Sequence, residues 1–130
     1  MKFRIIAATC AAFAFWMAGP ASAGPIFNGI IPNIPGKSLI ASEVNYAPGQ
    51  ADPPHTHAPS AFIFAYVVSG AIESKVNDGE TRIYRAGESW IEPPGAIHSI
   101  SRNASKTEPA KLLAVFVVDT DDKMRMTPIK

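Results

Sequence analysis

Three histidines are the side chains of this sequence best suited to chemistry, and two of them are separated by one residue. His55, Thr56 and His57 form a His-x-His sequence, and His98 is the third histidine. In an extended strand, side chains two residues apart point to the same face, so both imidazoles of the pair face one side. Imidazole is a common ligand of zinc, copper, iron and nickel. The pair therefore favours a metal site, whereas a lone histidine is more often a structural residue.

The residues around these histidines follow two spaced patterns. The first is Gly49, five residues, His55-Thr56-His57 and then Gly70 at the end of an apolar run. The second is Gly87, five residues, Pro93-Pro94-Gly95, two residues, His98 and then Asn103. In this order the patterns resemble the two motifs of the cupin superfamily, with Asn103 one position late. The resemblance spans roughly residues 44 to 118. It implies an all-β fold, a single cupin barrel of the double-stranded β-helix or jelly-roll type, and a metal held by the three histidines.

The resemblance also implies a glutamate ligand from the first motif, which this sequence lacks. The corresponding place falls at Ala61, Phe62 or Ile63, none of which binds metals. Glu92, directly before Pro93, is the nearest carboxylate and the candidate fourth ligand. A carboxylate buried alone is costly, but one beside a divalent cation is favourable. The alternative is that Glu92 points to solvent or pairs with an arginine, Arg85 or Arg102.

The expected cofactor is one divalent transition metal. Three imidazoles follow the usual affinity order, which favours copper with zinc and nickel close behind. Iron or manganese requires help from geometry or from supply, and the sequence leaves the choice among Cu, Zn, Ni, Fe and Mn open.

Three residues are candidate catalytic groups beside this metal. Glu92 is a candidate base, and Tyr66 and Tyr84 are candidates because a phenol near a metal donates a proton or orients a substrate. Tyr46 is considered with them. Core filling is the alternative for the aromatic residues, because a small barrel needs large side chains in its interior.

Three functions fit an open three-histidine site of this kind. The resemblance implies a small metal-dependent, dioxygenase-like enzyme that acts on a small organic substrate. A non-redox lyase or isomerase that abstracts a proton is the second, and a non-enzymatic protein that binds a metal or a small ligand is the third. Fold analogy does not choose between them, so whether the protein is an enzyme stays open.

The elements that must position these residues are short strands. Turn signals such as Pro48-Gly49 and Asn77-Asp78-Gly79 divide residues 38–119 into apolar or alternating runs, and no run has a helical period. We expect the barrel here. Residues 24–37, rich in Pro, Gly and Asn, predict an irregular N-terminal arm whose apolar residues pack on the barrel or on a second subunit, as in a homodimer. Residues 120–130 predict a polar C-terminal tail.

The N-terminus predicts an exported protein. Lys2 and Arg4 precede the uncharged apolar run of residues 5–19, and Ala21-Ser22-Ala23 offers a small-x-small cleavage site. Residues 1–23 are therefore expected to be a signal peptide, and the mature protein to be periplasmic or secreted. A membrane anchor is the alternative, but the run is short for the ~20 residues that a spanning helix needs.

Composition after this cleavage excludes two classes of partner. The loss of Lys2 and Arg4 leaves 10 basic against 11 acidic side chains, so the mature protein has no basic face for nucleic acid. No second long apolar run remains to hold it in a membrane. Cys10 lies within the predicted signal peptide, so the mature protein forms no disulfide. The expected partner is a small molecule.

Overall fold

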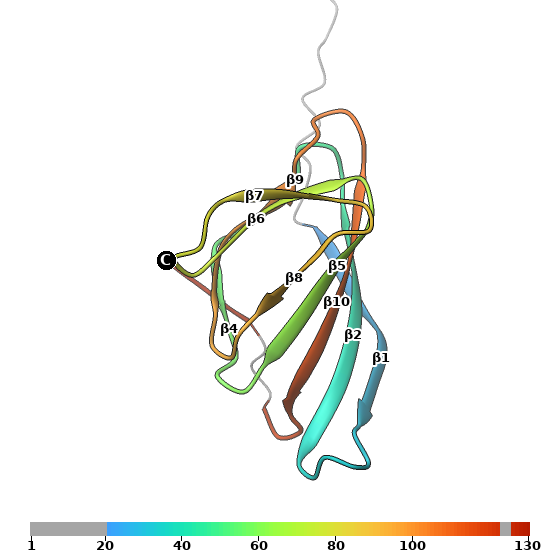
Figure 1. The fold of residues 1–130 in the computed structure, drawn as a ribbon, viewed down its shortest axis with the longest axis vertical. Helices are drawn as coiled ribbons and strands as arrows, with labels where there is room; N and C mark the ends of the chain where they lie inside the picture. Colours follow the sequence, from blue (N-terminus) through green and yellow to red (C-terminus); the bar gives the residue numbers. More distant parts are fainter. Residues whose placement is uncertain (1–20, 123–125) are drawn as a thin grey trace, which may run out of the picture.

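Antiparallel strands in two sheets make up the described part of the protein. The computed structural model describes residues 21–122 and 126–130. Its strands are β1 (Ser22–Ile30), β2 (Lys37–Tyr46), β3 (Ala51–Asp52), β4 (His55–His57), β5 (Phe62–Ser69), β6 (Ala71–Val76), β7 (Arg82–Arg85), β8 (Ser89–Glu92), β9 (Ile97–Asn103), β10 (Ala110–Asp119) and β11 (Met126–Pro128). One sheet has the order β1-β2-β10-β5-β8 and the other β11-β4-β9-β6-β7, with β3 also paired to β9 (Figure 1). The predicted all-β jelly-roll barrel is confirmed.

The interior is apolar because the long strands alternate between the inside and the outside of the barrel. Ile63, Ala65 and Val67 of β5 are buried, whereas Phe62 and Phe64 between and beside them are exposed. The buried side chains form two clusters, one around Tyr46, Val67, Ile72 and Trp90 and one around Ile40, Ile63 and Val118. Residues of both clusters line the cavity described below.

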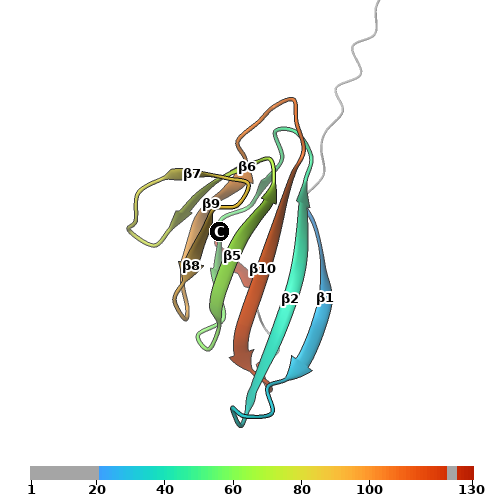
Figure 2. The same cartoon turned by 45° about the vertical axis from the view of Figure 1, so that its right-hand side comes forward.

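Half of the predicted irregular N-terminal arm forms a strand. β1 pairs with β2 from Ser22 to Ile30 and occupies the edge of its sheet (Figure 2). Pro25 is tolerated because it adjoins a register shift on this edge strand, where a missing N–H costs little. The side chains of Ile26 and Ile30 stay 66% and 71% exposed, so this part of the strand is held mainly by backbone pairing. The predicted signal peptide lies outside the described residues except for 21–23.

Part of the predicted polar tail also pairs with the barrel. Met126, Thr127 and Pro128 of β11 lie opposite the three residues of β4, and the N–H of Ile129 donates to the carbonyl of Pro54. All three β11 side chains are exposed, so the hydropathy pattern gave no sign of this strand.

Among residues 21–122 and 126–130, the structure contains no helix with the length and hydropathy that a bilayer requires.

A β-bulge in β9 explains the late position of Asn103. Lys75 pairs with Ile100 and Val76 with His98, so Ser99 is an extra residue that β6 does not match. In an unbroken strand, Ser101 and Asn103 would lie on the face opposite to that of His98. Because the bulge adds one residue, they lie on the same face as His98, and all three side chains are buried. The Asn103 amide donates to the carbonyls of Ala47 and Glu108 and thereby ties two loops to the barrel.

Two glycines with the same backbone angle allow a test of close packing at one corner of the barrel. Gly49 and Gly70 both have φ of 72°, but a Cβ at Gly70 would lie 2.5 Å from the carbonyl oxygen of Pro109 and one at Gly49 would meet nothing within 4 Å. We expect Gly49→Ala to lower the free energy of unfolding by about 1 kcal/mol through strain at positive φ. Gly70→Ala should cost at least ~2 kcal/mol more because of the clash with backbone. Urea denaturation measures both, and equal losses would contradict the packing described for Gly70.

Candidate metal centre

Two adjacent strands bring the three histidines together. His55 and His57 lie at the two ends of β4 and are 4% and 7% exposed, and the intervening Thr56 is half-buried. His98 of β9 lies directly opposite His55, so their side chains share the inner face of the sheet. Each imidazole offers one ligand atom such that the three atoms all lie within 4.8 Å of one another. The i, i+2 spacing of His55 and His57 therefore places both imidazoles on one face of the strand, as strand geometry predicts.

Neighbouring polar groups orient two of the imidazole rings. Nδ1 of His55 lies 2.8 Å from the carbonyl oxygen of Pro53, which only accepts, so Nδ1 donates and Nε2 keeps a free lone pair. The hydroxyl of the buried Ser74 lies 2.8 Å from Nε2 of His98. Such outer partners hold a ligating ring in one orientation.

Glu92 points into the same site. It is the last residue of β8, where Trp90 and Glu92 face inward and Ser89 and Ile91 face outward, and it is 2% exposed. Its Oε2 lies 2.8 Å from Nε2 of His57, its Oε1 lies 3.3 Å from Nδ1 of His98, and the Trp90 indole donates to Oε1 at 3.1 Å.

Neither alternative partner of Glu92 is used. Arg102 pairs with Glu73 on the outside of the barrel, and the buried Glu92 has its contacts with His57, His98 and Trp90. Pairing of Glu92 with either arginine, or its exposure to solvent, is therefore wrong for this structure. The sequence left the direction of Glu92 open, and in the structure it turns inward to the histidines.

Unsatisfied polar atoms converge between these side chains. Both ring nitrogens of His57 and Oε2 of Glu92 are buried and lack a partner with hydrogen-bond geometry among the described residues, although Nε2 and Oε2 are in close contact. Leaving such atoms without partners costs roughly 1–3 kcal/mol each. A divalent cation would satisfy the nitrogen and carboxylate lone pairs together, and this set of donors suits zinc, copper, nickel, iron or manganese. The residues present therefore fit a transition metal.

Burial and mutual contact shift the protonation of the site. Burial lowers the pKa of His98 to about 4, although the Glu92 carboxylate opposes this, and burial likewise lowers the pKa of His55. Burial raises the pKa of Glu92, but the contacts with His57 and His98 outweigh it and leave this pKa below its ordinary value. At neutral pH the site therefore offers neutral imidazoles at His55 and His98 and an ionised carboxylate, the forms that bind metals.

Comparison with known families gives the same assignment as the motifs. Residues 42–116, more than half of the chain, match the family model described as "Cupin domain". The chain belongs to the cupin family. Glu92, the carboxylate beside the histidines, lies on β8 and not in the segment after β4, where the first cupin motif has its glutamate.

Several known cupin relatives are similar to this protein. It is 34% identical over 90 residues to the "Germin-like protein subfamily 2 member 2" of Arabidopsis thaliana, a match that covers 66% of this chain and 40% of that protein. A solved structure of TT1209 from Thermus thermophilus matches with a TM-score of 0.61 and 25% identity, over 76% of this chain and 84% of that one. An oxalate oxidase in complex with the substrate analogue glycolate matches with a TM-score of 0.51 and 28% identity, over 65% of this chain and 46% of that one. This cupin therefore spans about two fifths of the length of the germin-like relative.

The two candidate catalytic tyrosines lie away from the histidines. Tyr66 is on the outward face of β5, between the inward Ala65 and Val67. Tyr84 packs on Trp90 with ring centroids 4.6 Å apart, behind the inner wall. Neither lines the cavity, so the structure does not bring them to the site. Tyr84 still touches the residue that hydrogen-bonds Glu92.

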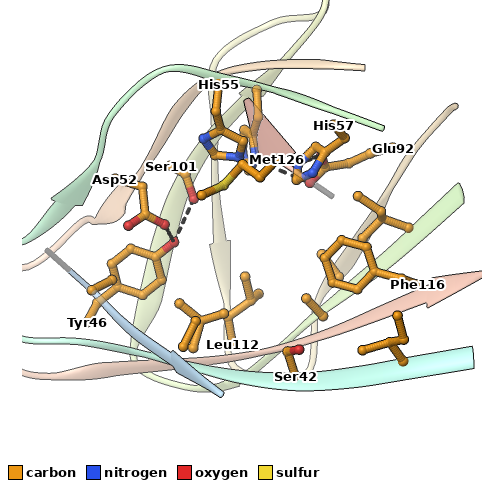
Figure 3. Close-up of a pocket in the computed structure, with 18 residues that line it drawn as sticks. Ser42, Tyr46, Asp52, His55, His57, Glu92, Ser101, Leu112, Phe116 and Met126 are labelled. Carbon is orange, nitrogen blue, oxygen red and sulfur yellow. Dashed lines mark hydrogen bonds and ion pairs between the residues drawn. The ribbon is translucent and has the colours of Figure 1, made fainter. Parts of the chain in front are cut away.

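The histidines and Glu92 lie in one wall of a cavity of about 260 Å³ inside the barrel (Figure 3). Tyr46, Asp52, Ser101, Phe116 and Met126 also line this cavity. Sequence reasoning missed three of these. Asp52 lies three positions before His55 in the sequence, and this proximity could have marked it as a site residue. The positions of Ser101 and Met126 could not be predicted, because they depend on the bulge in β9 and on the pairing of β11.

Burial and the Asp52 carboxylate raise the pKa of Tyr46 far above its ordinary range, so this phenol keeps its proton and is no base.

The depressed pKa of His98 predicts how stability depends on pH without metal. The unfolded chain takes up a proton at His98 below its ordinary pKa of 6.5, but the folded protein does so only near 4. Stability that is full above pH 6.5 should thus be lost as pH falls towards 4, by at most roughly 3 kcal/mol from this residue. Urea denaturation in chelator between pH 7.5 and 4 measures the loss, and His98→Asn should flatten it. An NMR titration that places the His98 midpoint near 6.5 would contradict the prediction.

Proposed function

We propose that this chain is an exported cupin enzyme that holds one transition metal with His55, His57, His98 and Glu92 and oxidises a small organic substrate. The observation that carries the proposal is the convergence of these four buried side chains on one internal cavity, with polar atoms of His57 and Glu92 left unsatisfied. When bound, the metal would supply an electrophilic centre with open positions for a substrate oxygen atom and for dioxygen.

The residues of the protein supply the remaining requirements of such a site. The carbonyl of Pro53 and the hydroxyl of Ser74 hold the rings of His55 and His98 in place. Glu92 is ionised and can accept a proton where it is not occupied by the metal. Phe116, whose ring centroid lies 6.0 Å from that of His57, adds an apolar wall that keeps water from this side.

Similarity favours oxidation over the other two functions. The oxalate oxidase match is 28% identical, whereas the structures of lyases that match, such as one described as the DMSP lyase DddQ, are 19% identical or less and show the fold alone. The volume of the cavity is just below the ~300 Å³ at the lower end of typical ligand sites, which suits a substrate of few atoms. A lyase or isomerase with Glu92 as the base is the second candidate, supported by the ionised and buried carboxylate.

Export and pairing of two chains are parts of the same proposal. The positive and apolar start of the sequence and its Ala21-Ser22-Ala23 site support cleavage after Ala23 and a periplasmic or secreted protein. Cleavage there would remove Ala21 and Ala23 from the cavity wall and leave Gly24–Ile30 of β1. The exposed Ile26, Phe27 and Ile30 on this edge strand support a homodimer in which β1 contributes to the interface.

Metal content tests the site directly. Protein purified from its native compartment should contain about one equivalent of a first-row transition metal by elemental analysis. His57→Ala should lose most of it, and Glu92→Gln should weaken the affinity by roughly 10- to 100-fold. Thr56→Ala, on the same strand but turned away, is the matched control and should keep its metal. The proposal fails if the wild-type protein contains no transition metal and retains none after addition.

Oxygen consumption separates oxidation from lyase chemistry. Protein loaded with copper, iron or manganese should consume dioxygen with at least one member of a panel of small carboxylic acids, phenols and diketones that includes oxalate and glycolate. The zinc-loaded protein should not, because zinc has no redox chemistry. Turnover of the same panel by the zinc form in anaerobic buffer would instead support the lyase or isomerase.

A further inference from the structure

A second polar cluster lines the cavity on a different side from the histidines. The Tyr46 hydroxyl of β2 lies 2.8 Å from Oδ2 of Asp52 and 2.8 Å from the hydroxyl of Ser101. Figure 3 shows these three side chains gathered at one side of the cavity, with the rings of His55 and His57 beyond them. Tyr46 and Ser101 are 2% and 3% exposed and belong to the interior, whereas Asp52 beside them is half-buried.

The fold places this cluster as accurately as it places the histidines. Asp52 of β3 is paired with Ser101 of β9, just as His55 of β4 is paired with His98 of β9. The bulge at Ser99 is what turns Ser101 to the same side as His98. The two polar ends of the cavity are thus built on the same strand, three residues apart.

Counting hydrogens shows that the cluster can only accept hydrogen bonds. The single hydrogen of the Tyr46 hydroxyl is donated to Asp52, since an ionised carboxylate has none to give. The hydrogen of the Ser101 hydroxyl must then be donated to the Tyr46 oxygen. No donor remains, whereas Oδ1 of Asp52 accepts no hydrogen bond from any residue that the structure describes.

Apart from these two polar groups, the cavity wall is mostly apolar. It consists of aliphatic side chains, with the Ser42 hydroxyl as a polar exception: Ile40, Val44, Ile63, Ala65, Leu112 and Ala114. A molecule that fills this space would therefore meet metal-binding groups at one end, aliphatic side chains along its length and hydrogen-bond acceptors at the other end.

We propose that Tyr46, Asp52 and Ser101 form a subsite for the hydrogen-bond-donating end, an ammonium or hydroxyl group, of a small acid whose carboxylate lies at the histidines. Only the position of the carboxylate rests on the proposed metal site. Ser101 lies three positions after His98 on β9, which is roughly 7–10 Å along a bulged strand. This length matches an aliphatic acid of about four carbons with the donor at its far end.

Calorimetric titration of the zinc-loaded full chain tests the subsite without turnover. The probes are 4-aminobutanoate, 4-hydroxybutanoate and butanoate, with the three- and five-carbon homologues of each. At the best-fitting length, the amino or the hydroxy acid should bind at least about tenfold tighter than the parent acid, as expected for a hydrogen bond to a charged group. Comparing the amino and hydroxy acids identifies which donor is preferred.

Three variants and the zinc content decide the outcome. Asp52→Asn should reduce the advantage of the substituted acid to less than about threefold while zinc content stays unchanged, and Ser101→Ala should reduce it less. Asp119→Asn is the matched control, because this exposed carboxylate pairs with Lys37 and should leave binding unaltered. The proposal is overturned if, at every chain length, the parent acid binds as tightly as the amino and hydroxy acids. It is also overturned if the tighter binding of the substituted acid persists in Asp52→Asn, because chelation of the zinc by the substituent would produce that result.

Failure of the metal site is distinguishable from failure of the subsite. If wild-type protein takes up no zinc, the proposed function fails, and wild type and Asp52→Asn are compared with 4-aminobutanoate on the metal-free protein. Weaker binding by the variant then supports the subsite, and equal or absent binding by both overturns it.

Discussion

A carboxylate buried inside the barrel is the constraint on which the site depends. Glu92 is 2% exposed, and an ion so far from water must be compensated by positive charge or by donors. The Trp90 indole donates to Oε1, which also lies near Nδ1 of His98, and Oε2 lies against Nε2 of His57. Because neutral imidazoles compensate a carboxylate only in part, the arrangement favours a cation at its centre. The barrel supplies the rigidity that holds these groups in place before any ligand arrives.

The carboxylate of this site differs in position from the glutamate of the first cupin motif. Cupins often take the fourth ligand from the strand region after His-x-His, where this chain has small or apolar residues. Glu92 reaches the histidines from β8, across the barrel. It lies two residues after Trp90 on this strand, so both side chains point into the barrel. Strand β5 lies next to β8, and Ile63, one of the places where the motif glutamate would fall, is paired directly with Glu92.

The sequence predicted those parts of the structure that depend on side-chain pattern. The barrel and the shared face of His55 and His57 follow from alternation and motif spacing. The cost of a buried charge made Glu92 a candidate, but it left open whether this side chain turns inward. β1 and β11 could not be predicted, because both attach by backbone pairing with their side chains exposed. Tyr66 and Tyr84 were predicted near the site from residue type alone, but residue type does not determine which face of a strand a side chain occupies.

The bulge in β9 also bears on how such a barrel changes through evolution. One additional residue in a strand would normally turn every following side chain to the opposite face. Here Ser99 takes up the additional length locally, so that Asn103 still anchors its loops and Ser101 still faces the cavity. A strand with this device accommodates one additional residue beside the histidines without a change of face for the side chains that follow, because the alternation resumes after the bulge.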